Sequence, residues 1–374
     1  MKIFTVVGTR PEIIRLSRTI PELDATAEHI LVHTGQNHDP ALSDIFFEEF
    51  GLRRPDHHLG VKAATAAEAI AAIIARVDAT LETERPDAFL CLGDTNSCLS
   101  VIPAKRRKIP IFHVEAGNRC YDPNVPEEIN RKIVDHTSDV NIAYSEAARR
   151  NLLAEGLDPQ RCLVLGSPLY EVLAHAAELI ANSAILGELN LAPGAYFVAS
   201  LHRAETVDEP ARLAELLSGL SALAAAHAYP VLISTHPRTR ERLGMVERDL
   251  DMRNLRFCAP FGFADYIALQ KNAACVLSDS GSLSEEAALL SVPAVALRDT
   301  HERLEAMDRA VTILAGVRAD TILRAVQTAM RHHKEGATPT HVSDYHAPAF
   351  SKTLARTVLS HTPYVNANVW RKAG

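Results

Sequence analysis

The sequence lacks the features that mark membrane-spanning and secreted proteins. No uninterrupted apolar stretch approaches the ~20 residues that a helix needs to cross a bilayer. The first residues, MKIFTVVGTRPE, run directly into a strand and a polar turn, without the layout of a cleavable signal. We therefore expect a cytoplasmic protein that does not bind a membrane.

Cysteine is present, but not in a pattern that binds metal or builds a disulfide framework. The spacing is irregular, and several cysteines lie inside apolar runs. We therefore expect buried, reduced thiols. The six residues are Cys91, Cys98, Cys120, Cys162, Cys258 and Cys275.

Three further absences narrow the function. The formal net charge of −7 argues against a nucleic-acid binder. No G-x-G-x-x-G turn is present, so a dinucleotide cofactor is not indicated. The sequence also has neither the ligand spacing of a metal site nor the serine elbow of a hydrolase. We expect neither a cofactor nor a metal.

Short apolar runs alternate with segments of helical periodicity, which predicts βαβ units and parallel sheets covered on both faces. The length of 374 residues favours two domains. We expect an α/β protein made of two doubly wound, Rossmann-like halves. The predicted strands cover residues 2–8, 29–35, 88–94, 109–117, 140–145 and 161–167, then 195–202, 229–236, 255–260, 274–280 and 293–299.

The junction between the halves is expected at Gly166-Ser167-Pro168, before a long helical segment from Tyr170 to about residue 189. This gives an N-terminal domain of residues 1–168 and a C-terminal domain of residues 169–374. The final helical segment has no strand after it and is a candidate to pack back on the first domain. Ligands bind at the carboxyl ends of parallel strands, so we expect one site in a cleft between the halves.

Polar motifs follow the predicted strands of the first half. Gly8 precedes a Pro-led helix start that suits a phosphate, with Arg10 and Arg15 nearby. A plain strand-to-helix turn with a surface arginine is the alternative. Asp94 follows one strand and is either a helix N-cap or a catalytic acid. Glu115 ends the next strand, where an acid needs a partner or a purpose.

A helix predicted from Pro126 carries Glu127 in its first turn and Arg131 in its second. Acids in a first turn are also ordinary complements of the helix dipole, so Glu127 alone does not indicate catalysis.

In the second half, His202 and His236 each end a strand beside an arginine. Ser280, Gly281 and Ser282 open a helix, and such a turn suits a pyrophosphate. A capping box between Ser282 and Glu285 is the alternative, and both are compatible. Arg303 adds charge to the same rim.

The combination of a diphosphate turn, arginines, two histidines and at least three acids suits acid/base chemistry on a nucleotide-activated substrate. These residue types and spacings alone do not separate an epimerase from a glycosyltransferase.

The ordered motifs resemble those of the non-hydrolysing UDP-GlcNAc 2-epimerases, which have the two-domain GT-B fold. The motifs are GTRPE, GDT, HVEAG, PEE-x-NR, HR-x-E, DSG-x-x-x-EE and RDT-x-ER, spread over residues 8–303. The resemblance implies an isomerase that eliminates UDP across C1–C2, forms a 2-acetamidoglycal and adds UDP back after reprotonation at C2. It implies no cofactor and a homodimer.

The resemblance also assigns roles to particular positions. It implies catalytic acids at Asp94, Glu115 and Glu127, and a histidine near the diphosphate at His202. It implies UDP contacts from Arg10, Tyr266, Ser280, Gly281, Ser282 and Glu286. Apart from the resemblance, the positions of Arg15, Arg131, His236 and Arg303 near strand ends and helix starts make them candidates for other parts of the cleft.

The chain departs from the family pattern at Arg15, Ser282 and Leu304, where the family usually has Lys, Gly and Pro. Residues 35–39 differ from a segment that binds an activating second UDP-GlcNAc in some members, which puts such activation in doubt.

A narrower likeness, carried by GDTNSCL, IVDHTSD, STHPRTRERL and YVNANVW among others, points to the branch that forms UDP-N-acetyl-L-fucosamine for surface polysaccharides. Its substrate would be UDP-2-acetamido-2,6-dideoxy-L-talose. Conversion of UDP-GlcNAc to UDP-ManNAc, another deoxy-amino sugar, and a GT-B glycosyltransferase remain alternatives.

Overall fold

The computed structural model describes residues 1–36, 40–201, 203–235, 242, 252–338 and 341–372. The chain divides into two compact units. Unit 1 is Met1–His175 with Asp344–Gly374, and unit 2 is Ala176–Ser343.

Among its described residues, unit 1 contains a seven-stranded sheet in the order β3-β2-β1-β4-β5-β6-β7, in which every neighbouring pair is parallel. The strands are β1 (Lys2–Val7), β2 (Glu28–His33), β3 (His57–His58), β4 (Ala88–Leu92), β5 (Ile111–Val114), β6 (Val140–Ala143) and β7 (Cys162–Val164). The helices are α1 (Arg10–Leu16), α2 (Thr19–Thr26), α3 (Pro40–Glu49), α4 (Ala66–Glu84), η1 (Asn96–Ser100), α5 (Val101–Arg106), α6 (Pro126–Thr137), α7 (Glu146–Ala154), η2 (Pro159–Arg161), α8 (Pro168–His175) and α18 (Phe350–Asn368).

The described residues of unit 2 form a six-stranded parallel sheet in the order β10-β9-β8-β11-β12-β13. The strands are β8 (Phe197–Leu201), β9 (Val231–Thr235), β10 (Leu255–Cys258), β11 (Cys275–Ser278), β12 (Ala294–Ala296) and β13 (Ile313–Leu314). The helices are α9 (Ala177–Ala181), α10 (Ile185–Glu188), α11 (Ala204–Val207), α12 (Pro210–His227), α14 (Phe263–Asn272), α15 (Leu283–Leu290), α16 (Leu304–Asp308) and α17 (Ala319–Lys334). The short helix η4 (Ser343–Tyr345) begins with the last residue of unit 2, and its other two residues belong to unit 1.

Two doubly wound parallel sheets are what the alternating sequence pattern predicts, and this fold class is confirmed. Each predicted strand is present, whereas the two-residue edge strands β3 and β13 are too short to leave a periodic pattern. The helical segment predicted after Pro168 is present, but it is divided into the three helices α8, α9 and α10. The Ser183 hydroxyl donates to Asp265 (2.6 Å) and accepts from the Ile185 N–H (3.3 Å), a local bond that starts α10 separately.

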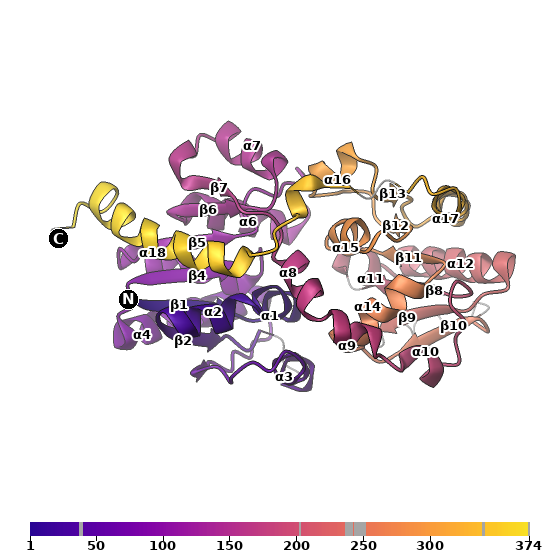
Figure 1. The fold of residues 1–374 in the computed structure, drawn as a ribbon, viewed down its shortest axis with the longest axis horizontal. Helices are drawn as coiled ribbons and strands as arrows, with labels where there is room; N and C mark the ends of the chain where they lie inside the picture. Colours follow the sequence, from indigo (N-terminus) through magenta and orange to yellow (C-terminus); the bar gives the residue numbers. More distant parts are fainter. Residues whose placement is uncertain (37–39, 202, 236–241, 243–251, 339–340, 373–374) are drawn as a thin grey trace. The chain divides into compact units, whose positions relative to one another are not determined.

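The unit boundary lies after His175, beyond the junction predicted at Pro168. Helix α8 packs against α1 and α18 of unit 1, and the Glu171 carboxylate accepts from the Ser351 N–H and hydroxyl, both at 2.8 Å. The C-terminal segment also belongs to unit 1, where α18 packs on α2 and α8 (Figure 1). Unit 2 is therefore shorter than the predicted C-terminal domain of residues 169–374, because α8 and α18 both belong to unit 1.

Helix α4 illustrates why these segments fold as they do. Thr65 and Glu68 form a capping box at its start. Ile73, Val77 and Leu81 recur at helical spacing and are buried in the core of unit 1. In unit 2, leucines of α12 are likewise buried in the core, where this helix packs against β9, β10 and α17.

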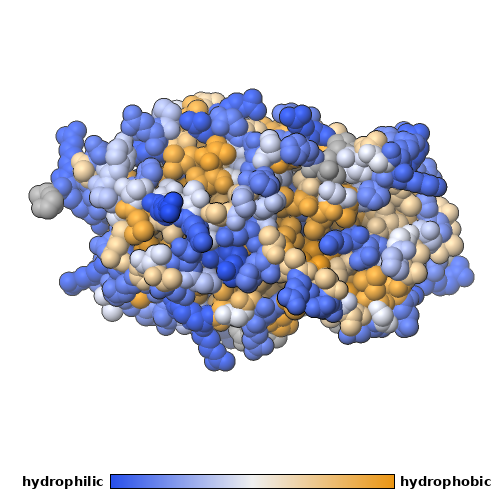
Figure 2. Space-filling view, in the orientation of Figure 1, coloured by the Kyte–Doolittle hydropathy of each residue, from blue (hydrophilic) through white to orange (hydrophobic). Residues whose placement is uncertain are grey.

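Within the described residues, no single helix has the length and apolar composition to span a membrane. Residues 168–175 and 177–188 meet those limits only when the two bent segments are taken together. On the face shown in Figure 2, hydrophilic residues predominate and hydrophobic ones gather in small patches. All six cysteines are free, as the sequence predicts, and four of them are buried.

Gly166 is expected to control how the C-terminal segment docks. It has φ +86°, and a Cβ there would lie 2.7 Å from the Ala347 Cβ and 2.9 Å from the Asp344 carbonyl oxygen. Gly166→Ala should lower the free energy of unfolding of unit 1 by ~2–4 kcal/mol, from backbone strain plus overpacking. The fluorescence of Trp370, the single tryptophan, reports this unfolding because it lies at the end of α18 in unit 1.

Gly156 is the matched control, because it has φ +84° but no atom within 4 Å of an added Cβ. Gly156→Ala should cost only ~1–2 kcal/mol of backbone strain. Equal losses for the two variants would contradict a role for the close approach at Gly166.

Candidate functional site

The predicted site residues fall into two groups, one after the strands of each sheet. Unit 1 carries Arg10, Arg15, Asp94, Glu115, Glu127 and Arg131, and unit 2 carries Tyr266, Ser280, Gly281, Ser282, Glu286 and Arg303. His202 and His236 lie outside the described residues.

The turn between β1 and α1 is closely packed. A Cβ on Gly8 would collide with the hydroxyls of Ser97 and Thr34, which follow β4 and β2. Glycine thus lets three strand-end loops meet. Arg10 begins α1 and is half-buried, with its guanidinium 5.9 Å from the ring centroid of Phe46.

Glu12 is the last residue of the GTRPE motif and is buried, but the sequence offered no reason to include it among the predicted site residues. One carboxylate oxygen accepts from the backbone N–H groups of Gly8 (2.5 Å) and Thr9 (2.7 Å). The other accepts from the Thr95 hydroxyl (2.6 Å), beside Asp94. Burial raises the pKa of Glu12 to about 7, against the opposing effect of these hydrogen bonds. Glu12 therefore connects the turn between β1 and α1 to the loop after β4 that carries Asp94.

Asp94 is held by an arginine from α6. Both Nε and Nη2 of Arg131 lie 2.8 Å from one Asp94 carboxylate oxygen, and Arg131 Nη1 lies 2.9 Å from Glu128. Burial acts to raise the pKa of Glu128, but hydrogen bonds from Cys120 and Arg131 bring it below its usual value. The Asp94 side chain remains 28% exposed, so it is fixed in place yet accessible.

Glu115 follows β5 with φ +71°, a left-handed conformation that is uncommon for a residue other than glycine. Its carboxylate lies 3.5 Å from Nε of the buried Arg15, and 3.5 Å from the Asn118 amide nitrogen. Such backbone strain persists only where surrounding contacts enforce it. Arg15, which the sequence predicts near the turn after β1, is thus the ion-pair partner of Glu115.

Glu127 differs from the other two acids. It lies in the first turn of α6 and is half-buried. Its carboxylate makes no hydrogen bond or ion pair with the part of the chain that the structure describes. Its neighbour Glu128, in contrast, is fully engaged with Arg131, Cys120 and Tyr121. Glu127 therefore keeps a carboxylate that is available to a ligand.

In unit 2, Ser280 to Ser282 form the turn between β11 and α15. Ser282 is the N-cap, but its side chain makes no capping bond to the helix. Its hydroxyl instead donates to Glu286 (2.7 Å), so the capping box considered for Ser282 and Glu285 does not form. The start of α15 thus has no side-chain cap, a setting that suits an anion.

Glu286 is held in one orientation from two sides. Besides the Ser282 hydroxyl, the Gln270 side-chain amide donates to its other oxygen at 2.7 Å. Tyr266 lies in the first turn of α14, the helix that also supplies Gln270, and is half-buried. Tyr266 lies four residues before Gln270 on α14, so the two side chains project from the same face of this helix.

Three arginines donate hydrogen bonds to backbone carbonyls of the Asp279–Ser282 turn. Arg203 Nε donates to the Asp279 carbonyl (2.8 Å), and Arg303 Nε donates to the Gly281 carbonyl (3.1 Å). Arg298 pairs with Glu302, whose carboxylate occupies the space that a Cβ on Gly281 would need. Arg303 is only 2% exposed and pairs with Glu285 at 3.1 Å. Arg303 therefore supports the turn from the interior of unit 2, and its place in a ligand cleft stays a prediction.

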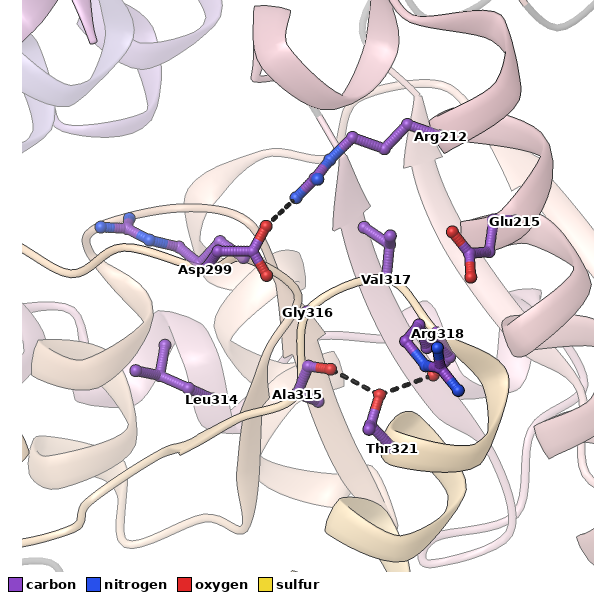
Figure 3. Close-up of a pocket in the computed structure, with 10 residues that line it drawn as sticks. Arg212, Glu215, Asp299, Leu314, Ala315, Gly316, Val317, Arg318 and Thr321 are labelled. Carbon is purple, nitrogen blue, oxygen red and sulfur yellow. Dashed lines mark hydrogen bonds and ion pairs between the residues drawn. The ribbon is translucent and has the colours of Figure 1, made fainter. Parts of the chain in front are cut away.

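A pocket of about 600 Å³ lies elsewhere in unit 2 (Figure 3). It is bounded by α12, the segments after β12 and β13, and the start of α17. Arg212 pairs with Asp299 across it, and the Thr321 hydroxyl bonds the carbonyls of Ala315 (2.6 Å) and Arg318 (2.8 Å). None of the predicted site residues lines it. Within the described ranges, no group of three His, Cys, Asp or Glu side chains is arranged to hold a metal.

Glu12 should give unit 1 a measurable pH dependence. Between pH 4.5 and about 7 the unfolded chain releases the Glu12 proton while the folded protein retains it, so stability falls as pH rises. Glu12→Gln removes this titration. As the pH rises from 4.5 to 7, the wild type should lose stability that the variant keeps. The free energy of unfolding of the variant minus that of the wild type should therefore increase by up to ~3 kcal/mol. Urea unfolding followed by Trp370 fluorescence measures it.

Glu68 is the matched control, because it occupies the same position in the capping box of α4 but lies at the surface. Glu68→Gln should change stability by a similar amount at every pH. A pH-dependent change that is seen for Glu12→Gln but not for Glu68→Gln is therefore due to the burial of Glu12. Parallel pH curves for Glu12→Gln and the wild type would contradict this account of Glu12.

Comparison with known proteins matches these features to one family. A profile described as UDP-N-acetylglucosamine 2-epimerase matches residues 21–358. The structure of UDP-N-acetylglucosamine 2-epimerase from Rickettsia bellii is similar over 100% of both chains, with 46% identity and a TM-score of 0.92. The UDP-GlcNAc 2-epimerase of Methanocaldococcus jannaschii, solved in complex with UDP-GlcNAc and UDP, is similar over 96% of this chain and 100% of that one, with 31% identity and a TM-score of 0.88.

A third relative acts on a different sugar. The UDP-2,3-diacetamido-2,3-dideoxy-D-glucuronate 2-epimerase of Pseudomonas aeruginosa is 32% identical over 88% of this chain and 92% of its own length. None of these three names refers to the UDP-N-acetyl-L-fucosamine branch, so that branch stays a prediction. The chain therefore belongs to the UDP-N-acetylglucosamine 2-epimerase family and is a non-hydrolysing isomerase that acts at C2 of a UDP-linked sugar.

Proposed function

We propose that the enzyme inverts C2 of a UDP-linked 2-acetamido sugar by eliminating UDP and adding it back. The C2 hydrogen has no adjacent carbonyl, so direct proton exchange is slow. A base instead removes the C2 proton, its electron pair forms the C1=C2 double bond, and the C1–O bond breaks so that UDP leaves with its electron pair. The reverse steps deliver a proton to the other face of C2 and rebuild the C1–O bond.

The observation that carries this proposal is the unequal setting of three carboxylates in unit 1. Asp94 and Glu115 are each fixed by an arginine, whereas Glu127 makes no such bond with the described residues. Inversion by elimination needs one group that takes a proton and another that returns one to the opposite face. Three acids with different constraints supply such groups, and Arg10 and Arg15 supply positive charge for the departing diphosphate.

For unit 2 we propose the UDP site. The uncapped start of α15 suits the diphosphate, with Ser280, Gly281 and Ser282 around it. Glu286, oriented by Ser282 and Gln270, suits a pair of ribose hydroxyls, and Tyr266 suits the face of the uracil ring. His202 would act near the diphosphate and His236 elsewhere in the site.

We propose UDP-2-acetamido-2,6-dideoxy-L-talose as the substrate, with UDP-N-acetyl-L-fucosamine as product. The sequence motifs at residues 93–99 and 364–370, among others, support it. UDP-GlcNAc is the second candidate, because two of the similar solved structures carry that activity in their names. The homodimer and the cytoplasmic location also stay predictions.

Proton NMR in D2O tests both the reaction and the substrate. Each UDP-sugar is incubated separately with the enzyme. Deuterium at C2 with the UDP linkage intact is the expected result, and a higher kcat/KM for the deoxytalose sugar would support the narrower proposal. A preference for UDP-GlcNAc would overturn that part alone. Release of UDP only when an acceptor sugar is added would indicate a glycosyltransferase.

Substitution of the three acids tests the catalytic assignment. Asp94→Asn, Glu115→Gln and Glu127→Gln should each lower kcat by ~100-fold or more. Glu146→Gln is the control, because Glu146 is likewise a first-turn acid, on α7, and is exposed. It should leave kcat unchanged. Near-normal turnover in all three acid variants would remove these residues from the mechanism.

A further inference from the structure

A buried ionic network lies directly beneath the loops that carry Asp94 and Glu115. His113, near the end of β5, is 1% exposed. Its Nδ1 lies 2.8 Å from an Asp135 carboxylate oxygen, and its Nε2 lies 2.8 Å from the Gly93 carbonyl oxygen. Both partners are acceptors, so only the doubly protonated imidazolium can donate to both.

The surroundings of His113 favour its charged form. Burial opposes the charge, but the hydrogen bond and the negative charge of Asp135 raise the pKa of His113 to about 9. Cys91, on the neighbouring strand β4, is the register partner of His113.

Asp135, on α6, is the centre of the network and is fully buried. Its second oxygen accepts from the Gly117 N–H (3.2 Å) and from Arg119 Nη1 (2.7 Å). Arg119 is also buried and forms a two-point pair with Glu155, with both N–O distances 2.7 Å. The network thus places its charges in alternation, and each has a partner.

The network connects the elements that carry the three acids. Gly93, bonded by His113, directly precedes Asp94, and Gly117, bonded by Asp135, lies two residues after Glu115. Helix α6, which supplies Asp135, begins with Glu127 in its first turn. The same pair of side chains therefore fixes the β4 loop, the β5 loop and α6 relative to one another within unit 1.

We propose that His113 and Asp135 are positioning residues that set the separation of Asp94 and Glu115 for proton transfer at C2, an inference that rests on the proposed function. They do not contact the sugar. They act by holding the Gly93 carbonyl and the Gly117 N–H at a fixed distance. A displacement of about 1 Å between reacting groups can cost ~100-fold in rate.

A matched pair of substitutions separates positioning from stability. Asp139 is also a fully buried carboxylate that bonds β5, accepting from the Ile111 N–H (3.0 Å) and Lys105 Nζ (2.5 Å), but at the other end of the strand. Asp135→Asn should lower kcat by ~100-fold with KM within about threefold of the wild-type value. Asp139→Asn should destabilise unit 1 comparably while keeping kcat within about threefold of the wild-type value.

Equal kcat values for the two folded variants would overturn the positioning role. Absence of C2 exchange in the wild-type enzyme would instead contradict the proposed function. Should Asp135→Asn not fold, the wild-type protein with 15N-labelled histidine supplies the test. Near neutral pH the ring of His113, assigned by the loss of its signals in His113→Gln, should carry protons on both nitrogens. A ring with a single proton would overturn the proposal.

Discussion

The Asp135 carboxylate is the group on which the architecture of unit 1 around its acids depends. A buried charge is stable only when it is paired and its lone pairs are satisfied. Asp135 meets this condition with three partners, the His113 ring, the Arg119 guanidinium and the Gly117 N–H. These partners come from β5 and the loop after it, and His113 extends the contact to the end of β4. Without Asp135, His113 and Arg119 would be left as buried cations with one acceptor fewer.

The same principle operates at two other points. Glu12 joins the turn after β1 to the loop after β4 through the Thr95 hydroxyl. In unit 2, Glu302 lies between Arg298 and Arg203 and fills the space beside Gly281. At each of these points a buried carboxylate helps to fix a backbone turn. In our proposal, the ligand binds to that turn on the side away from the carboxylate. The partly exposed acids Asp94 and Glu127 can then differ in how tightly they are held, because the backbone that carries them is already fixed.

The sequence predicted the parts of this structure that depend on local periodicity and on strand ends. Apolar runs located the main strands, and Asp94, Glu115 and Ser280 follow strands as expected. It did not predict partners far apart in the chain, such as Arg131 with Asp94 or Arg119 with Glu155, because such pairs form only when the sheet order is known. The boundary between the units lies beyond the predicted junction for a similar reason, since α8 joins unit 1 by packing and not by composition. The capping box at Ser282 fitted the local pattern but lost to the bond with Glu286.

Cleavage and re-formation of the C1–O bond is the central chemical claim, and positional isotope exchange tests it most directly. A UDP-sugar substrate with oxygen-18 in the bridge between C1 and the β-phosphorus is incubated with the enzyme, and the recovered UDP-sugars are examined by phosphorus NMR. Elimination frees the β-phosphate, so the label should move from the bridge to the non-bridging positions as C2 is inverted. Complete inversion at C2 with the label still wholly in the bridge would contradict the account.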